Sequence, residues 1–163
     1  MLNKSRSVGG LHWLWLSLIA VIIDQLVKFI IVAHIQPYSE HPVMPFFKLT
    51  LGFNRGAAFS FLDSQNGWQQ WLFIFISILV CVSIGFALQR LKVSQAWLCI
   101  ALALIVGGAL GNLVDRITLG YVVDYFVLYA GSWYWPAFNV ADSCICIGAV
   151  MYIIDMILRK RKK

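Results

Sequence analysis

Residues 121–143 read YVVDYFVLYAGSWYWPAFNVADS, and they hold two aspartates, Asp124 and Asp142, in apolar and aromatic surroundings. Lys, Arg and Glu are absent from the whole stretch between Arg116 and Arg159. The segment leaves one hydrophobic run and enters the next, so both carboxylates are expected at one face of a membrane. The rest of the chain then serves as the scaffold that brings the two acids together.

The composition is that of an integral membrane protein. Of the 163 residues, 61% are hydrophobic and 12% are charged, whereas soluble domains are about half apolar and about a quarter charged. Each of four apolar runs is long enough, at about 1.5 Å per residue, to cross a hydrocarbon core of about 30 Å. These runs cover residues 11–35, 68–88, 96–116 and 137–158. The first run is too long for the apolar core of a cleaved signal peptide, so we expect it to be a retained transmembrane helix. All four spans are expected to belong to a single membrane domain over residues 1–163.

The Lys and Arg residues predict the orientation of these spans. The N-terminus, the 89–95 loop and the C-terminus are basic, whereas residues 117–136 contain neither Lys nor Arg. Because cytoplasmic segments carry the excess of positive charge, we expect both termini in the cytoplasm and the loops 36–67 and 117–136 outside. The basic run at 159–163 is typical of an anchor to anionic lipid. The net charge of +6 therefore indicates membrane lipids rather than nucleic acid as partners.

Both outer loops are too hydrophobic to be simple linkers. Residues 45–53 and 122–128 are rich in side chains that favour strands, and residues 56–62 are expected to form a short helix that dips into the interface. The predicted fold class is an all-α membrane protein with four transmembrane helices. A small β-like element and the short helix would lie on its outer membrane face.

Asp142 is the more unusual of the two aspartates, because it lies about five residues into the fourth span, roughly 7–8 Å below its outer end. A charge at that depth is costly and is usually paired, internal and functional. The preceding loop can fold back so that Asp124 meets Asp142. Two adjacent carboxylates cannot both ionise cheaply, so one keeps its proton while the other takes a proton from water. The pair predicts hydrolysis by activated water; the alternative is that the aspartates are helix caps or partners in ion pairs.

Five further polar residues fall at the same predicted face. Arg116 could orient a substrate carbonyl or a lipid headgroup through its fork of donors, or it could simply extend to the membrane interface. Asp115 is expected to support Arg116 or to pair with Arg55. The three remaining side chains could bind the backbone of an extended peptide or could cap helices; they are Asn54, Asn112 and Asn139.

Asp24 and Lys28 lie inside the first span at i,i+4 spacing, and we expect a structural ion pair that offsets their burial. A proton carrier at Asp24 would instead define a small proton-coupled transporter, which is the competing class. Transporter sites usually lie near the bilayer midplane, whereas the acids here are concentrated at the outer face and the chain shows no inverted repeat. The hydrolase is therefore favoured. At the inner end of the fourth span, Asp155 is expected to pair with the basic tail.

The sequence contains no pattern typical of a metal site or of a nucleophilic side chain. Its four cysteines lie inside apolar runs without C-x-x-C or Cys/His spacing, and neither H-E-x-x-H nor G-x-S-x-G occurs. We expect no metal and no cofactor. Residues 107–111 contain a G-x-x-x-G pattern, which predicts close helix packing rather than a function.

Five motifs follow one another along the chain: DQLVK at 24–28, NRGAAF at 54–59, GGALGNLVDR at 107–116, VVDYF at 122–126 and FNVADS at 138–143. With these five motifs in order, four predicted spans and both termini expected in the cytoplasm, the chain resembles the lipoprotein signal peptidases (signal peptidase II). These are the membrane aspartyl peptidases of bacteria. The resemblance extends over nearly the whole chain.

The resemblance implies that Asp124 and Asp142 form a catalytic dyad, which removes signal peptides from prolipoproteins at the outer side of the bacterial cytoplasmic membrane. Substrates of that family carry a diacylglyceryl group on the cysteine that follows the cleaved bond. The family's other functional positions would contact substrate or support the dyad, and a structural ion pair would lie behind them. They fall on Asn54, Asn112, Asp115, Arg116 and Asn139, and on Asp24 and Lys28 for the pair. We expect a monomer.

Overall fold

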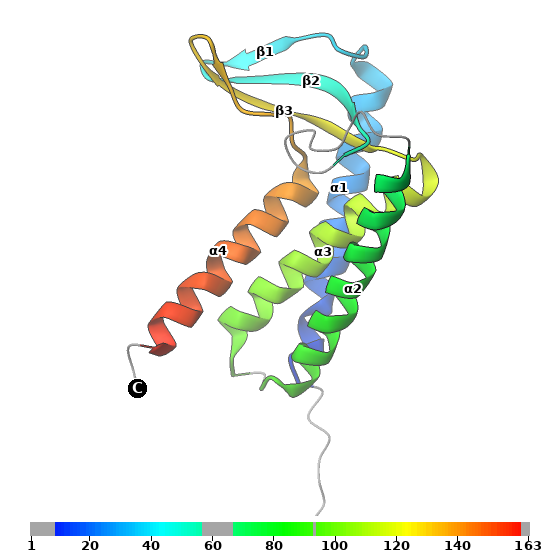
Figure 1. Ribbon diagram of the computed structural model, residues 1–163. Helices are drawn as coiled ribbons and strands as arrows, with labels where there is room; N and C mark the ends of the chain where they lie inside the picture. The colour runs from blue at the N-terminus through cyan, green and yellow to red at the C-terminus, as the bar shows by residue number, and fades with distance from the viewer. Residues whose placement is uncertain (1–8, 57–66, 93, 161–163) are drawn as a thin grey trace, which may run out of the picture.

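The computed structural model describes residues 9–56, 67–92 and 94–160, and over these residues it confirms the predicted fold class. Four long helices form a bundle, and a small antiparallel sheet lies across one end of it (Figure 1). Each of the four is long and apolar enough to cross a membrane. A short 3₁₀ helix precedes them. The bounds are η1 (Gly9–Trp13), α1 (Leu14–His34), α2 (Trp68–Arg90), α3 (Ala96–Thr118) and α4 (Val140–Lys160).

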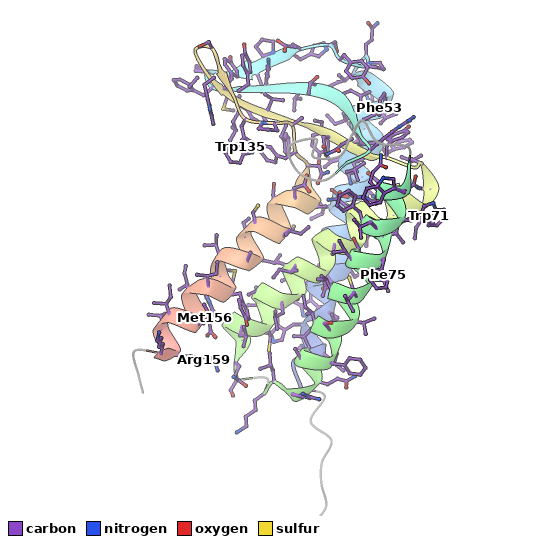
Figure 2. All side chains as sticks on the ribbon, viewed as in Figure 1. Phe53, Trp71, Phe75, Trp135, Met156 and Arg159 are labelled. Carbon is purple, nitrogen blue, oxygen red and sulfur yellow. The ribbon has the colours of Figure 1, made fainter. Side chains whose placement is uncertain are left out.

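The helix α3 is the centre of the bundle, and it packs against each of the other three helices. Most of its residues are buried, whereas the other three helices carry large exposed apolar side chains suited to lipid. Two of these exposed side chains, Phe75 on α2 and Met156 on α4, are labelled in Figure 2. This difference in exposure follows from composition, because α3 has small residues where its neighbours have bulky ones.

Glycines allow the close approach of α3 to its neighbours, as the G-x-x-x-G pattern predicts. A Cβ atom on Gly107 would lie 2.7 Å from the Cβ of Ala20 on α1. On its other side, a Cβ on Gly108 would overlap the backbone of Ala141 on α4. Both contacts have the same consequence: α1 and α4 are held against the end of α3 that carries the polar residues.

The sheet contains both predicted strands and two more. Its order is β1-β2-β3-β4, with every neighbouring pair antiparallel. Its bounds are β1 (His41–Met44), β2 (Phe47–Asn54), β3 (Val122–Ala130) and β4 (Trp133–Tyr134). An irregularity in the β2–β3 register between Leu49 and Gly52 places Gly52 opposite Asp124. The short helix expected at 56–62 lies almost entirely outside the described residues.

A compact apolar cluster fastens the sheet to the bundle. Leu51 of β2, together with Val123 and Tyr125 of β3, packs against Ile31 near the end of α1. All four side chains are nearly or fully buried. The strand that carries Asp124 is therefore fixed relative to α1, and its position over the helices is set.

Candidate active site

The N-terminus of α4 positions Asp142. The side-chain oxygen of Asn139 accepts a hydrogen bond from the backbone N–H of Asp142 at 2.9 Å, and the Asp142 carboxylate accepts one from the backbone N–H of Asn139 at 3.1 Å. This reciprocal arrangement is a capping box, with Asn139 as the N-cap. Asp142 is thus held in the first turn of α4, where the helix dipole favours a negative charge.

Asp124 reaches the same place from β3, and Asn139 joins the two aspartates. The Nδ2 atom of Asn139 donates to Asp124 Oδ1 at 2.8 Å, while the side-chain oxygen and the backbone N–H of Asn139 bond to Asp142. The second oxygen of Asp124 accepts from Asn54 Nδ2 at 2.9 Å. Asn112 Nδ2 donates to Asp142 Oδ1 at 2.8 Å, and Asn112 Oδ1 accepts from Asn139 at 3.1 Å. The structure therefore gathers all three predicted asparagines around the two aspartates.

Burial gives Asp124 an unusual proton affinity. Its side chain is almost completely removed from solvent, and this burial, together with the nearby charge of Asp142, raises the pKa of Asp124 to about 7. Hydrogen bonds from Asn54 and Asn139 and the charge of Lys28 act in the opposite direction. Near neutral pH this carboxyl group is divided between its protonated and charged forms, as a group that exchanges protons requires.

The expected ion pair of Asp24 and Lys28 is present, and it is part of a larger buried cluster. Lys28 Nζ lies 2.8 Å from Asp24 Oδ2, 2.9 Å from Asp115 Oδ2 and 3.0 Å from Asn112 Oδ1. The expectation that Asp115 supports Arg116 or pairs with Arg55 missed this Lys28 pair, because the cross-helix contact depends on how α1 is rotated against α3. The cluster bonds directly to Asn112, which bonds to Asp142.

Three contacts in this region were not expected from the sequence. Asp24 Oδ1 accepts a hydrogen bond from the backbone N–H of Ala141 at 2.8 Å, so the carboxylate also binds the N-terminus of α4. Gln25 Nε2 donates to Asp115 Oδ1 at 2.8 Å. The hydroxyl of Tyr125, which is fully buried, accepts from the backbone N–H of Val140 at 3.2 Å. Gln25 and Tyr125 belong to the motifs DQLVK and VVDYF, which was the available signal.

Arg116 lies in the last turn of α3, and it lines the same cavity as the two aspartates. Its Nη2 atom donates to the backbone oxygen of Gly56 at 3.1 Å, and its guanidinium lies 5.1 Å from the ring centre of Phe73. The charges of Asp142 and Asp124 both act on this guanidinium. Arg116 thus supplies positive charge beside the two carboxylates.

A cavity of about 480 Å³ opens where the sheet meets the bundle, and both aspartates line it. Its polar wall is formed by those aspartates with Asn54, Asn112 and Arg116. Its remaining surface is largely apolar and comes from α2, from β3, from α4 and from the segment before α4. That surface includes Phe73, Leu128, Trp135, Phe138, Ile145 and Ile147; Trp135 is labelled in Figure 2. An apolar cavity with a few convergent polar groups is the usual form of a ligand site.

Groups of His, Cys, Asp and Glu side chains are the usual ligands of protein-bound metal ions. Within residues 9–56, 67–92 and 94–160, no group of three or more His, Cys, Asp or Glu side chains could hold a metal ion. The described site consists instead of two carboxylates, three amides and a guanidinium.

Two carboxylates that both bond to Asn139 lie at one end of a bundle of four membrane-length helices, and an aspartic peptidase, which is a hydrolase, needs two such acids. A sequence model of the family described as Signal peptidase (SPase) II matches residues 16–158. The chain belongs to the signal peptidase II family.

Individual relatives agree with this assignment. The chain is 49% identical to the lipoprotein signal peptidase of Pseudoalteromonas atlantica over 98% of its own length and 97% of that protein. It is 48% identical to the lipoprotein signal peptidase of Pseudomonas aeruginosa, covering 94% of this chain and 92% of that one. A solved structure described as a bacterial membrane enzyme superimposes with a TM-score of 0.80 at 28% identity, over 93% of this chain and 91% of the other.

Proposed function

We propose that the protein is a lipoprotein signal peptidase, an endopeptidase that removes signal peptides from diacylglyceryl-modified prolipoproteins. Cleavage would occur just before the lipid-modified cysteine, through water activated between Asp124 and Asp142. The names of the relatives, lipoprotein signal peptidase, support the substrate class. The observation that carries the mechanism is the position of Asn139, which is fully buried and bonds to both of the carboxylates that line the largely apolar cavity.

The two aspartates have different surroundings, and these favour different roles. Asp142 lies in the first turn of α4, where the helix dipole stabilises its charged form. Asp124 lies on a strand, without such a dipole, and its pKa is raised to about 7 by burial and then by Asp142. In our proposal Asp142 takes a proton from the attacking water. Asp124 donates its proton to the carbonyl oxygen of the scissile bond, and the roles then reverse when the amine leaves.

The walls of the cavity suit a substrate that is a membrane helix. Phe73 on α2 and residues 145–147 on α4 present apolar surface beside the aspartates. A signal peptide has an apolar core, so it can approach from the bilayer between these two helices. The acyl chains of the modified cysteine would remain in lipid while the scissile bond enters the polar end of the cavity. The surrounding apolar side chains would exclude water and strengthen the electrostatic interactions of the dyad.

The distribution of charge supports an orientation with the site at the outer face of the inner membrane. Four basic residues lie at the ends of α2 and α4 and in the loop after α2, at the end of the bundle opposite the sheet (Figure 1): Arg90, Lys92, Arg159 and Lys160. Cytoplasmic segments carry such positive charge. Both termini would then be cytoplasmic, and Asp124 and Asp142 would face the outside.

A transporter that uses Asp24 as a proton carrier is not favoured. Asp24 is completely buried, and its two oxygens bind Lys28 and the backbone of Ala141. If Asp24 took up a proton, Lys28 would lose one of its two charged carboxylate partners, and the contact of Asp24 with the N-terminus of α4 would be weakened. The contacts of Asp24 support a structural role instead.

The test is cleavage of a diacylglyceryl-modified prolipoprotein by the purified protein in lipid bicelles, beside Asp124→Asn and Asp142→Asn. Asn keeps the shape of the side chain and removes the ionisable oxygen. We expect cleavage by the wild type and a loss of at least about 1,000-fold in each variant, since the two groups act as a unit. Asp155→Asn, which alters an acid at the opposite end of α4, should cleave normally. Normal cleavage by both dyad variants would overturn the mechanism, and an inactive wild type would overturn the function.

A further inference from the structure

The helix α2 contributes to the site through residues that the sequence analysis gave no role. Gln70 and Phe73 are three residues apart, so they lie on the same face of α2. Gln70 Nε2 donates to the backbone oxygen of Arg116 at 2.9 Å. The ring centre of Phe73 lies 5.1 Å from the guanidinium of the same arginine. This face of α2 thus holds both the backbone and the side chain of Arg116.

A continuous series of contacts leads from Arg116 to Asp124. Arg116 Nη2 donates to the backbone oxygen of Gly56 at 3.1 Å, and the backbone N–H of Gly56 donates to Asn54 Oδ1 at 2.9 Å. Because the amide oxygen of Asn54 is engaged in this way, its Nδ2 atom is turned toward Asp124 Oδ2, at 2.9 Å. Each contact fixes the orientation of the next group, and the last group in the series is the carboxyl that would donate the catalytic proton.

We propose that Phe73 is a positioning residue for the peptidase reaction: its ring holds the guanidinium of Arg116, and through Gly56 and Asn54 it fixes the support of Asp124. This inference rests on the proposed function. A cation over an aromatic face is attracted by the ring quadrupole, and the attraction grows where water is excluded. Phe73 is half-buried in the apolar wall of the cavity, so its contact with Arg116 lies in such a place.

Two simpler roles for Phe73 predict different results. A ring that only fills space between helices would affect the unfolding temperature and could be replaced by any apolar side chain of similar size. A ring that only touches the substrate would affect KM. A ring that acts through Arg116 affects kcat, because Asp124 is supported in the reacting complex, and it can be replaced only by another aromatic side chain.

The experiment compares Phe73→Leu, Phe73→Trp and Phe75→Leu in the full-length protein, using a diacylglyceryl-modified prolipoprotein in bicelles. Phe75 lies on the same helix and is 62% exposed, so Phe75→Leu is the matched control for the loss of one ring. We expect Phe73→Leu to lower kcat by roughly threefold to thirtyfold. KM should change little, because leucine keeps this part of the cavity wall apolar. Phe73→Trp should restore most of kcat, since indole binds cations best. Phe75→Leu should stay within about twofold of the wild type.

Equal kcat values for the two leucine variants would overturn the inference, as would a tryptophan variant no better than the leucine variant. A rise in KM without a change in kcat would also overturn it, because it would indicate direct contact with the substrate. Phe73→Met replaces Phe73→Leu if the latter does not fold. Cleavage by the wild type is the internal control: its absence would overturn the proposed function, whereas cleavage with unchanged kcat in Phe73→Leu would overturn this inference alone.

Discussion

In the proposed mechanism, the single side chain of Asn139 serves both folding and chemistry. Its amide oxygen caps α4, and its amide nitrogen binds Asp124. The same residue therefore begins the helix that carries Asp142 and links that helix to the strand that carries Asp124. An aspartate at this position could cap the helix but would add a third negative charge, so the amide suits both tasks.

Substitution of Asn139 by Ser should separate these two tasks. Serine is also a good N-cap, so the free energy of unfolding should be about 1 kcal/mol lower in Asn139→Ala than in Asn139→Ser. Both variants also lose the buried hydrogen bonds of the Asn139 amide nitrogen, which lowers the stability of each by a similar further amount. Neither variant can bond to Asp124, and we expect both to lose roughly 100-fold in cleavage rate because the dyad is no longer held. Chemical unfolding and cleavage assays provide the comparison. A serine variant with full activity would show that the bond to Asp124 is dispensable.

The pKa of Asp124 predicts two effects of pH with a common cause. The folded protein holds this proton near pH 7, whereas the unfolded chain releases it near 3.8, so stability falls as the pH rises from about 4 through about 7. Asp124→Asn removes this pH-dependent loss of stability, so it should raise the unfolding temperature more at pH 8 than at pH 4. In the wild type, cleavage should decline above about pH 7 as Asp124 loses the proton that it would donate in the proposed mechanism. A flat profile between pH 6 and pH 9 would contradict the assignment of Asp124 as the proton donor.

At the scale of the elements, the site depends on how closely α4 approaches α3. A Cβ on Gly108 would overlap the backbone of Ala141, directly before Asp142. The helix α4 is otherwise held at this end by the N-terminal contacts with Asp24 and Tyr125. Any displacement of α4 here moves one aspartate relative to the other.

Gly108→Ala should therefore reduce activity more than the small size of the change suggests. The added methyl group must push α4 away from α3, and we expect a loss of roughly 10- to 100-fold in cleavage rate with a lowered unfolding temperature. Gly85→Ala is the matched control, because a Cβ at that position of α2 meets nothing within 4 Å. It should leave cleavage unchanged and should not lower the unfolding temperature. Equal activity of the two alanine variants would mean that the α3–α4 distance does not control the dyad.

The elements also show what the sequence could and could not reveal. Hydropathy predicted all four spans, with ends that differ from the observed ones by a few residues, because apolar length alone determines them. The strands at 45–53 and 122–128 were predicted by their β-branched and aromatic residues. The strands β1 and β4 were not, since one is short and fully exposed and the other has two residues. Short strands of this kind form by pairing with a neighbour that local sequence does not specify.

The polar residues divide in a similar way. Depth and apolar surroundings were sufficient to select Asp124 and Asp142, and the structure brings both to one cavity. The pair of Lys28 with Asp115 and the role of α2 were missed, because each depends on the rotation of one helix against another. Spacing along one helix determines which residues share its face, but it does not determine which neighbour that face meets.

For the whole molecule, the decisive property is which end faces the cytoplasm. Ser132 lies in the exposed turn between β3 and β4, and Ser94 lies exposed in the loop between α2 and α3. The two positions are at opposite ends of the bundle (Figure 1), and serine and cysteine differ by one atom. Ser132→Cys and Ser94→Cys are therefore matched probes of the two sides of the membrane.

In spheroplasts treated with a membrane-impermeant maleimide, we expect Ser132→Cys to be labelled and Ser94→Cys to be labelled only after permeabilisation. The unaltered protein gives the background from its own four cysteines. The physical reason is the retention of Arg90 and Lys92 on the cytoplasmic side, which places the short loop beside them there as well. The reverse pattern would put the dyad in the cytoplasm. A lipoprotein signal peptide inserts with its basic N-terminus inside, so its cleavage site would then lie across the membrane from Asp124 and Asp142.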